Sequence, residues 1–273
     1  MDNGNVVSAS IRTTAKKEKI VVGDYVELQK NDYDKDKFII TKVLPRKNYI
    51  PRPFVANIDK LLIVIACKPE PDLLLVDKLI IYCMLNDIEP IIVINKIDIA
   101  NKAFVEDIKN QYYFTEVYEI SAKENLGVDI LKEHIENKLC VVCGQSAVGK
   151  SSFLNALIPT LSQDTQELSS KINRGKHTTR VNEVFIDDNL MIADTPGFSS
   201  LELDLDYKEL ALYYPEFEEY LGKCKYLDCS HIKEGKDCVV VSALNENKIN
   251  KFRYNRFVDL YNNLKEKWEK KYD

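Results

Sequence analysis

The chain of 273 residues lacks any long apolar run, although 45% of its residues are hydrophobic and 30% are charged. No stretch approaches the roughly 20 apolar residues that a transmembrane helix needs. Residues 1–5 (MDNGN) also lack the basic and then apolar segments with which a secretory signal peptide begins. We therefore expect a cytoplasmic location and no membrane partner.

An excess of positive charge is also missing, because the formal net charge is −5. Basic residues nevertheless outnumber acids at both ends, by eleven to seven in residues 1–57 and by eight to four in residues 248–273. Residues 201–221 between them hold seven acids and one lysine. The two basic ends could bind phosphates, and solvated surface charge explains the pattern equally well.

Disulfide pairing is not indicated, because the chain has an odd number of cysteines, seven in all. Three of them lie with one of only three histidines in the pattern Cys-x4-Cys-x-His-x6-Cys. Four soft ligands with no spare position predict a closed, tetrahedral, structural Zn²⁺ site, and free thiols are the alternative. The predicted ligands are Cys224, Cys229, His231 and Cys238.

The N-terminal residues read as short strands separated by polar loops. Residues 21–28 predict a turn followed by a strand in which apolar and polar residues alternate, and residues 37–43 predict a second strand. The prolines at 45, 51 and 53 predict a linker over residues 45–57. Because short strands need closure to remove exposed edges, we predict a small β-barrel here.

From Lys60 onward strands alternate with helices, which is typical of an α/β fold with a doubly wound, mostly parallel sheet. The predicted strands are residues 61–66, 90–94, 116–120 and 139–143, and a hairpin of residues 181–186 and 190–193. Residues 71–88 predict a helix whose core-facing positions are Leu75, Leu79, Cys83 and Met84. A polar helical tail is predicted over residues 246–271.

Three other potential ligands are predicted to be core residues. Cys140 and Cys143 resemble a C-x-x-C motif, but they lie on one predicted strand, where alternation points them to opposite faces. We interpret both thiols, and His134 in the preceding segment, as packing residues.

A phosphate loop is predicted at residues 144–151 (GQSAVGKS), which match G-x-x-x-x-G-K-S. Its backbone N–H groups can wrap a β-phosphate, while Lys150 neutralises the β/γ oxygens and Ser151 binds Mg²⁺. The apolar strand before it and the helix after it argue against a chance glycine loop. The predicted nucleotide contacts are Gly144, Gln145, Ser146, Ala147, Val148, Gly149, Lys150, Ser151 and Ser152.

The segment Asn95-Lys96-Ile97-Asp98 predicts that the base of the bound nucleotide is guanine. The Asp98 carboxylate can accept from both N1–H and the 2-amino group of guanine, an amino group that adenine lacks. Asn95 would bind the other edge and pin the loop, and the stem of Lys96 would cover the base. A second guanine segment at another strand end consists of Ser121, Ala122 and Lys123.

The remaining elements of a GTPase follow the phosphate loop. Asp194 is predicted on the Mg²⁺ side and the Gly197 N–H at the γ-phosphate. In the segment GKHTTR (residues 175–180), we favour Thr179 over Thr178 as the further Mg²⁺ ligand. Phe198 stands where many GTPases have a glutamine that orients the attacking water.

Phe198 cannot orient a water molecule, so intrinsic hydrolysis is expected to be slow. Another group or a partner must then position the water. His177, in the predicted switch, is the candidate for this catalytic role beside Lys150, and a solvated loop histidine is the alternative.

The two nucleotide motifs occur in reversed order. The guanine tetrapeptide begins at residue 95 and the phosphate loop at residue 144, whereas the phosphate loop comes first in an ordinary small GTPase. The sequence therefore predicts a circularly permuted GTPase domain.

With these permuted motifs, GKHTTR at 175–180, DTPGF at 194–198 and the Cys/His cluster, the chain resembles the RsgA (YjeQ/YloQ) family. The segments LPRKN (44–48) and PFVANID (53–59) extend the resemblance over nearly the whole chain. It implies an OB-fold-like RNA-binding domain (1–57), a circularly permuted P-loop GTPase domain (58–205) and a C-terminal helical zinc-binding domain (206–273).

The resemblance also implies a function. Members act in late maturation of the small (30S) ribosomal subunit, contact its rRNA, and hydrolyse GTP to GDP and phosphate when the subunit stimulates them. The expected partners are GTP and GDP, the small subunit and its rRNA, and the chain is expected to be a monomer. The N-terminus is shorter than in the family, so the barrel is expected to be incomplete.

Two other interpretations remain open. An RNA- or ribosome-binding factor could use guanine nucleotide mainly as a structural or regulatory ligand, and Phe198 favours this. A signalling GTPase with protein partners is the other, although such proteins seldom carry flanking barrel and zinc domains.

Overall fold

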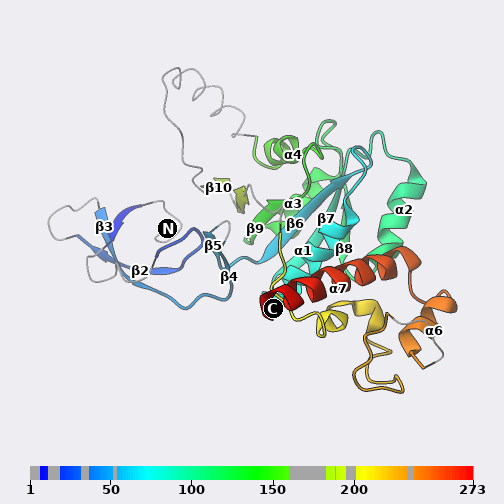
Figure 1. Ribbon diagram of the computed structural model, residues 1–273. Helices are drawn as coiled ribbons and strands as arrows, with labels where there is room; N and C mark the ends of the chain where they lie inside the picture. The colour runs from blue at the N-terminus through cyan, green and yellow to red at the C-terminus, as the bar shows by residue number, and fades with distance from the viewer. Residues whose placement is uncertain are drawn as a thin grey trace.

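The computed structural model describes residues 7–11, 19–31, 37–51, 54–159, 183–187, 189–194, 201–232 and 237–272. Three parts follow one another along the chain (Figure 1): short strands, a central α/β sheet, and a helical C-terminal part that ends in one long helix. Within these residues no helix combines the length and the apolar character that crossing a membrane requires.

The N-terminal part is built from short strands. They are β1 (Ser8–Ile11), β2 (Val26–Lys30), β3 (Lys37–Val43), β4 (Tyr49–Pro51) and β5 (Phe54–Ala56). The first three form a sheet in the order β1-β3-β2, and the last two form a hairpin that an isolated bridge joins to Val22. The predicted strands near 21–28 and 37–43 are confirmed. The linker prediction is wrong over the hairpin, because Pro51 ends a strand, where a missing N–H is tolerated.

The central sheet has the strand order β10-β11-β9-β6-β7-β8, and only β10 runs antiparallel to its neighbour. Its strands are β6 (Lys60–Ala66), β7 (Glu89–Asn95), β8 (Glu116–Glu119), β9 (Leu139–Cys143), β10 (Glu183–Asp187) and β11 (Leu190–Asp194). All predicted strands are confirmed to within two residues at each end. The strand before the phosphate loop, β9, lies between β11 and β6, so strands from both sides of the loop in sequence flank it.

Helices cover both faces of this sheet (Figure 1). They are α1 (Leu73–Leu85) and α2 (Lys102–Gln111) on one face, and α3 (Val128–Ile135) and α4 (Lys150–Leu157) on the other. Cys143 belongs to the core under α1 and Cys140 to the core under α3 and α4, which confirms the prediction of opposite faces. Burial raises the pKa of Cys140 to about 12, so its thiol stays protonated.

The C-terminal part has its own apolar core. Its elements are the 3₁₀ turns η3 (Leu210–Tyr213) and η4 (Pro215–Phe217) and the helices α6 (Val239–Asn245) and α7 (Lys251–Tyr272). The rings of Phe217 and Phe257 meet edge to face at 4.8 Å between centroids. The predicted polar tail is thus an amphipathic helix that buries Phe257, Leu260 and Leu264 along one face.

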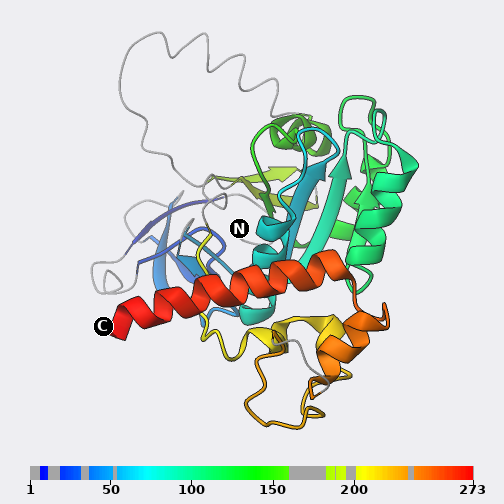
Figure 2. The same cartoon turned by 45° about the vertical axis from the view of Figure 1, so that its right-hand side comes forward.

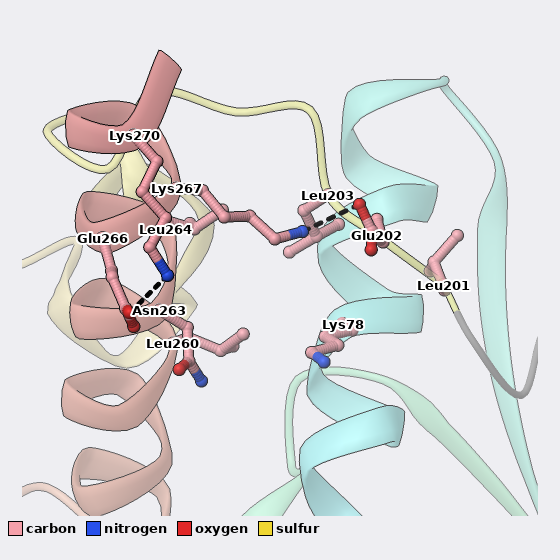
Figure 3. A pocket seen from close by; sticks show the side chains of 10 residues that line it. All are labelled: Lys78, Leu201, Glu202, Leu203, Leu260, Asn263, Leu264, Glu266, Lys267 and Lys270. Atoms are coloured by element: carbon pink, nitrogen blue, oxygen red, sulfur yellow. Dashed lines mark hydrogen bonds and ion pairs between the residues drawn. The ribbon is translucent and has the colours of Figure 1, made fainter. Parts of the chain in front are cut away.

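Helix α7 passes across α1 of the central part (Figure 2) and contacts it. Leu201 and Leu203, at the start of the C-terminal part, lie between these two helices. They line a cavity of about 440 Å³ there (Figure 3). An ion pair between Glu202 and Lys267 Nζ, at 2.9 Å, joins this segment to α7. The two parts therefore share an apolar contact with a charged rim.

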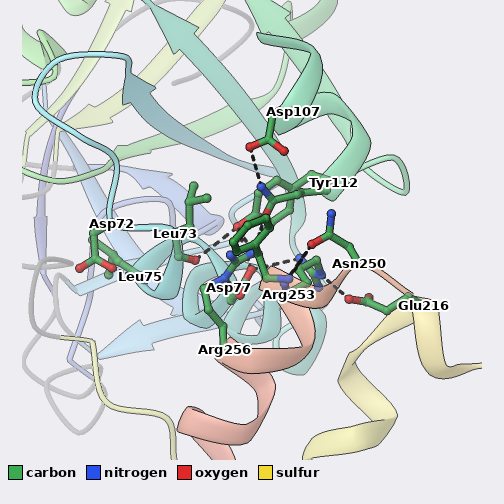
Figure 4. A network of polar contacts seen from close by, with 12 residues as sticks. Asp72, Leu73, Leu75, Asp77, Asp107, Tyr112, Glu216, Asn250, Arg253 and Arg256 are labelled. Carbon is green, nitrogen blue, oxygen red and sulfur yellow. Dashed lines mark hydrogen bonds and ion pairs between the residues drawn. The ribbon is translucent and has the colours of Figure 1, made fainter. Parts of the chain in front are cut away.

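A buried ionic network fastens α7 to α1 (Figure 4). The side chain of Asp77 on α1 is 1% exposed, and its Oδ1 accepts from Arg253 at 3.0 Å and from the Tyr112 hydroxyl at 2.8 Å. Its Oδ2 accepts from Arg256 Nε at 2.5 Å, and Arg253 also pairs with Glu216. Burial lowers the pKa of Arg253, but the Asp77 and Glu216 carboxylates raise it by more. Both guanidinium groups therefore stay charged.

Replacing Asp77 by asparagine should destabilise the protein strongly, because two buried arginines lose the carboxylate that compensates them. We expect the free energy of unfolding to fall by about 3–5 kcal/mol, measured by urea denaturation. The matched control is Glu133→Gln on the exposed face of α3, which should change it by less than about 0.5 kcal/mol. Equal stability of the Asp77 and Glu133 variants would contradict the assignment.

Candidate functional site

The predicted nucleotide residues meet at the carboxyl ends of adjacent parallel strands. The phosphate loop follows β9, Asn95 is the last residue of β7, and Ser121 follows β8. Since β9, β6, β7 and β8 are consecutive in the sheet, the reversed sequence order does not separate these residues in space. This edge of an open α/β sheet is where such folds bind ligands.

The backbone of the phosphate loop requires glycine at two positions. Gly144 has φ +139° and a Cβ there would lie 2.2 Å from the Val64 carbonyl oxygen. Gly149 has φ +93°, with only 2.6 Å between a Cβ and Asn95 Nδ2. Ala147 also has a positive φ of 64°, which is strained for a residue with a side chain. Helix α4 begins directly after Gly149, so its N-terminus faces the loop.

The ammonium group of Lys150 lies over the phosphate loop. Its Nζ donates to the carbonyl oxygens of Gly144 at 2.9 Å and Gln145 at 2.7 Å. A lysine held here places a positive charge beside the loop's backbone N–H groups, which is the arrangement that phosphate oxygens need.

The side-chain amide of Asn95 joins three loops, and the residue is 2% exposed. Its Nδ2 donates to the Val148 carbonyl at 3.0 Å, within the phosphate loop. Its Oδ1 accepts from the N–H groups of Lys96 at 2.8 Å and Ala122 at 3.1 Å. The Asn95 amide thus ties the loop after β7 to the loop after β8 and to the phosphate loop, and its contact with the base stays a prediction.

The carboxylate of Asp98 is oriented by the buried Ser121 hydroxyl, which donates to Asp98 Oδ1 at 2.6 Å. A carboxylate has about four acceptor sites, so this bond leaves capacity for the two donors of a guanine edge. The Lys96 side chain bridges two loops, because its Nζ donates to the carbonyls of Lys68 at 2.9 Å and Ala147 at 2.8 Å. Lys123 is exposed and pairs with the adjacent Glu124 at 3.0 Å.

The structure places only part of the predicted Mg²⁺ side. Ser151 lies in the first turn of α4, and Asp194 ends β11, beside Val142 of β9. Both positions therefore border the phosphate loop. His177, Thr178, Thr179, Gly197 and Phe198 lie outside the described residues.

The four predicted metal ligands converge in the C-terminal part, with their ligand atoms all within 4.8 Å of one another. Cys224 Sγ and Cys238 Sγ lie 3.5 and 3.6 Å from His231 Nδ1 and 3.9 Å from each other. A tetrahedral zinc ion with ordinary bond lengths would separate sulfur from nitrogen by about 3.6 Å and sulfur from sulfur by about 3.8 Å. The donor set and its spacing therefore fit Zn²⁺.

Backbone groups around this cluster support thiolate ligands. The N–H of Val239 points to Cys224 Sγ at 3.4 Å, and the N–H of Val241 points to Cys238 Sγ at 3.5 Å. The Tyr254 hydroxyl donates to the His231 carbonyl at 2.8 Å and so fixes the backbone of the histidine. Such outer contacts orient metal ligands and tune their basicity.

A second cluster, which the sequence did not indicate, lies at the amino ends of the strands. His134 Nε2 lies 2.6 Å from Glu116, and Lys60 Nζ lies 2.7 Å from Glu89 and 3.1 Å from His134 Nε2. The Lys60 ammonium thus already supplies the positive charge that a metal would bring to the carboxylates. His134 is half-buried rather than a core residue, because its ring reaches these partners at the surface.

Comparison with known proteins gives concordant matches. The sequence profile described as RsgA GTPase matches residues 43–204. Two proteins named small ribosomal subunit biogenesis GTPase RsgA are each 41% identical: one from Clostridium kluyveri, over 92% of this chain and 87% of its own length, and one from Ruminiclostridium cellulolyticum, over 89% and 81%.

Two crystal structures share the fold at 30% sequence identity. YjeQ from Thermotoga maritima superposes with a TM-score of 0.81, covering 96% of this chain and 91% of its own. YloQ, described as a circularly permuted GTPase, gives 0.78 with 98% and 89% coverage. Sequence profile, relatives and fold agree with the strand order and the converging motifs, and the chain belongs to the RsgA GTPase family.

Proposed function

We propose that this chain binds and hydrolyses GTP at the carboxyl ends of β7, β8 and β9 and acts in biogenesis of the small ribosomal subunit. The observation that carries the nucleotide site is the Asn95 amide, which bonds to both guanine segments and to the phosphate loop. The ribosomal role is supported by the names of the relatives at 41% identity.

The residues of the nucleotide site have separate roles in this proposal. Asp98, held by Ser121, accepts from the guanine edge, and the loop around Lys150 receives the phosphates. Ser151 and Asp194 bind Mg²⁺, with Thr179 or Thr178 as a further ligand. Mg²⁺ supplies charge neutralisation at the β- and γ-phosphate oxygens.

The guanine and phosphate motifs contain no side chain that could position the attacking water. Phe198 has no hydrogen-bonding group, so we propose that His177 and the bound subunit together orient the attacking water. Gly197 would contact the γ-phosphate through its N–H. We further propose that residues 1–57 contact rRNA and that residues 58–205 and 206–273 are the GTPase and zinc-binding domains.

The runner-up function is a ribosome-binding factor in which guanine nucleotide serves only as a structural or regulatory ligand. Phe198 favours it, since a GTPase without a water-orienting side chain hydrolyses slowly by itself. The two functions differ in whether small subunits stimulate turnover.

Small ribosomal subunits should accelerate steady-state GTP hydrolysis by the full-length chain, measured as phosphate release. Lys150→Ala should reduce the stimulated rate by about a hundred-fold, because it removes a charge that stabilises the transferring phosphoryl group. Large subunits serve as the control. No acceleration by small subunits would favour the runner-up function.

Exchanging Asp98 for asparagine should alter the choice of base. The asparagine amide has one acceptor oxygen and one NH2 donor, so it can accept from N1–H while donating to the 2-carbonyl of xanthine. It cannot accept from both N1–H and the 2-amino group of guanine as the carboxylate does. We expect GDP affinity to fall about a hundred-fold, or about 3 kcal/mol, and XDP affinity to rise, both by calorimetric titration. Unchanged preference for GDP would place the base elsewhere.

We also propose that Cys224, Cys229, His231 and Cys238 hold one structural Zn²⁺. The support is the tetrahedral spacing of their ligand atoms and the N–H groups that face two of the sulfurs. A metal at this position would cross-link the loop that precedes α6 to the segment that follows η4, in a region held by few regular elements.

Cys229→Ser should lower the zinc content from about one ion per chain and reduce the unfolding temperature, because a coordinating thiolate is lost. Mass spectrometry of the metal and circular dichroism measure these two effects. The matched control is Cys67→Ser, a cysteine outside the cluster. Equal zinc content in the two variants would contradict the site.

A further inference from the structure

The side chain of Gln145, the second residue of the phosphate loop, bonds to backbone 73 residues earlier in the chain. Its Oε1 accepts from the Asp72 N–H at 2.6 Å, and its Nε2 donates to the Glu70 carbonyl at 2.8 Å. Both ends of the amide are therefore engaged by the segment between β6 and α1. A side chain satisfied in this way fixes two pieces of backbone relative to each other.

The phosphate loop depends on such contacts, because residues 144–149 have no regular secondary structure. Its second half is held by Asn95, which bonds Val148, and by Lys96, which bonds Ala147. In the first half, Lys150 bonds the carbonyls of Gly144 and Gln145 from within the following helix, and the Gln145 side chain ties the backbone to the segment between β6 and α1. The φ values of +139° at Gly144 and +64° at Ala147 mark backbone that surrounding contacts must keep in place.

The tie also reaches a rigid element. Asp72 is the N-cap of α1, where its Oδ1 accepts from the Leu75 N–H at 3.0 Å. Helix α1 packs on the sheet and carries Asp77, whose carboxylate is buried in the ionic network with α7. The loop is thus tied, through the segment between β6 and α1, to the N-terminus of a helix that packs on the sheet.

We propose that Gln145 is a positioning residue for phosphate binding. By fixing the first half of the loop to the segment before α1, it keeps the loop's backbone N–H groups directed at the β-phosphate. The inference rests on the proposed function, since it assigns a role within the same nucleotide site. It differs from the roles of Lys150 and Ser151, which act on the phosphates and the metal themselves.

The position of Gln145 predicts which part of the nucleotide it affects. Asp98 and Ser121 bind the base on the other side of Asn95, and their contacts do not include Gln145. Loosening the first half of the loop should therefore reduce the affinity for ligands that have a β-phosphate. The affinity for GMP, which has no β-phosphate, should change little. A general loss of stability would not separate the two ligands.

The test uses the full-length chain and calorimetric titration with GDP and with GMP. Gln145→Met keeps the length of the side chain and removes both hydrogen bonds, and Gln145→Ala serves where methionine impairs folding. We expect about ten-fold weaker GDP affinity, which corresponds to about 1.4 kcal/mol, and GMP affinity within about two-fold of wild type.

The matched control is Asn86→Ala. Asn86 also uses a side-chain amide on backbone, donating from Nδ2 to the Tyr82 carbonyl at 2.8 Å, but at the far end of α1. It should reduce the unfolding temperature slightly and leave both affinities within about two-fold of wild type.

Two results would overturn the inference. One is wild-type GDP affinity in both Gln145 variants, and the other is a loss of GMP affinity as large as the loss of GDP affinity. Failure of the wild-type chain to bind GDP would instead refute the proposed function, so the two failures are distinguishable.

Discussion

The buried amide of Asn95 is the contact on which the nucleotide site depends. A primary amide at 2% exposure costs free energy unless its donors and acceptors are satisfied, and here backbone from three loops satisfies it. Each loop follows a different strand of the central sheet. The amide therefore holds the loops after three separate strands together at one site. Glycine is required at position 149 because its backbone approaches this side chain closely.

The circular permutation keeps these loops together at one edge of the sheet and changes the order in which the strands follow one another along the chain. The strands that carry the guanine segments precede the phosphate loop in the sequence, and they lie together on one side of β9. Leu201 and Leu203, which come soon after β11 in the sequence, lie at the contact between α1 and α7. The C-terminal part is thus attached to the central part through the chain itself, through the apolar contact with α1 and through the Asp77 network.

Much of the site could be predicted because its signals are local. Continuous apolar runs predicted the parallel strands, and the residues after them predicted the ligand contacts. The alternation of a strand predicted that Cys140 and Cys143 face opposite cores. The spacing of three cysteines and one histidine predicted a cluster whose atoms the structure brings within 4.8 Å.

Other features could not be predicted, because their partners are far apart in sequence. Asp77 and Arg253 are separated by 176 residues, and each looks like an ordinary surface charge on a helix until the helices pack. The hairpin of β4 and β5 was masked by prolines that usually mark linkers. The second contact of Gln145, with Glu70, depends on the route of the loop after β6, which no local pattern reports.

The amino-acid pattern alone determined which residues the proposed chemistry uses: glycine where backbone must approach closely, a carboxylate proposed for the base, a lysine proposed for phosphates, and soft ligands proposed for a metal. These follow from residue type and short spacing, since each is a property of a few neighbouring residues. Only the tertiary structure decided how the pieces are held, through Asn95, Gln145 and Asp77. The physical reason is that a buried polar group needs a hydrogen-bond partner, and tertiary packing can supply that partner from a distant part of the sequence. No single segment of the sequence shows which partner it will be.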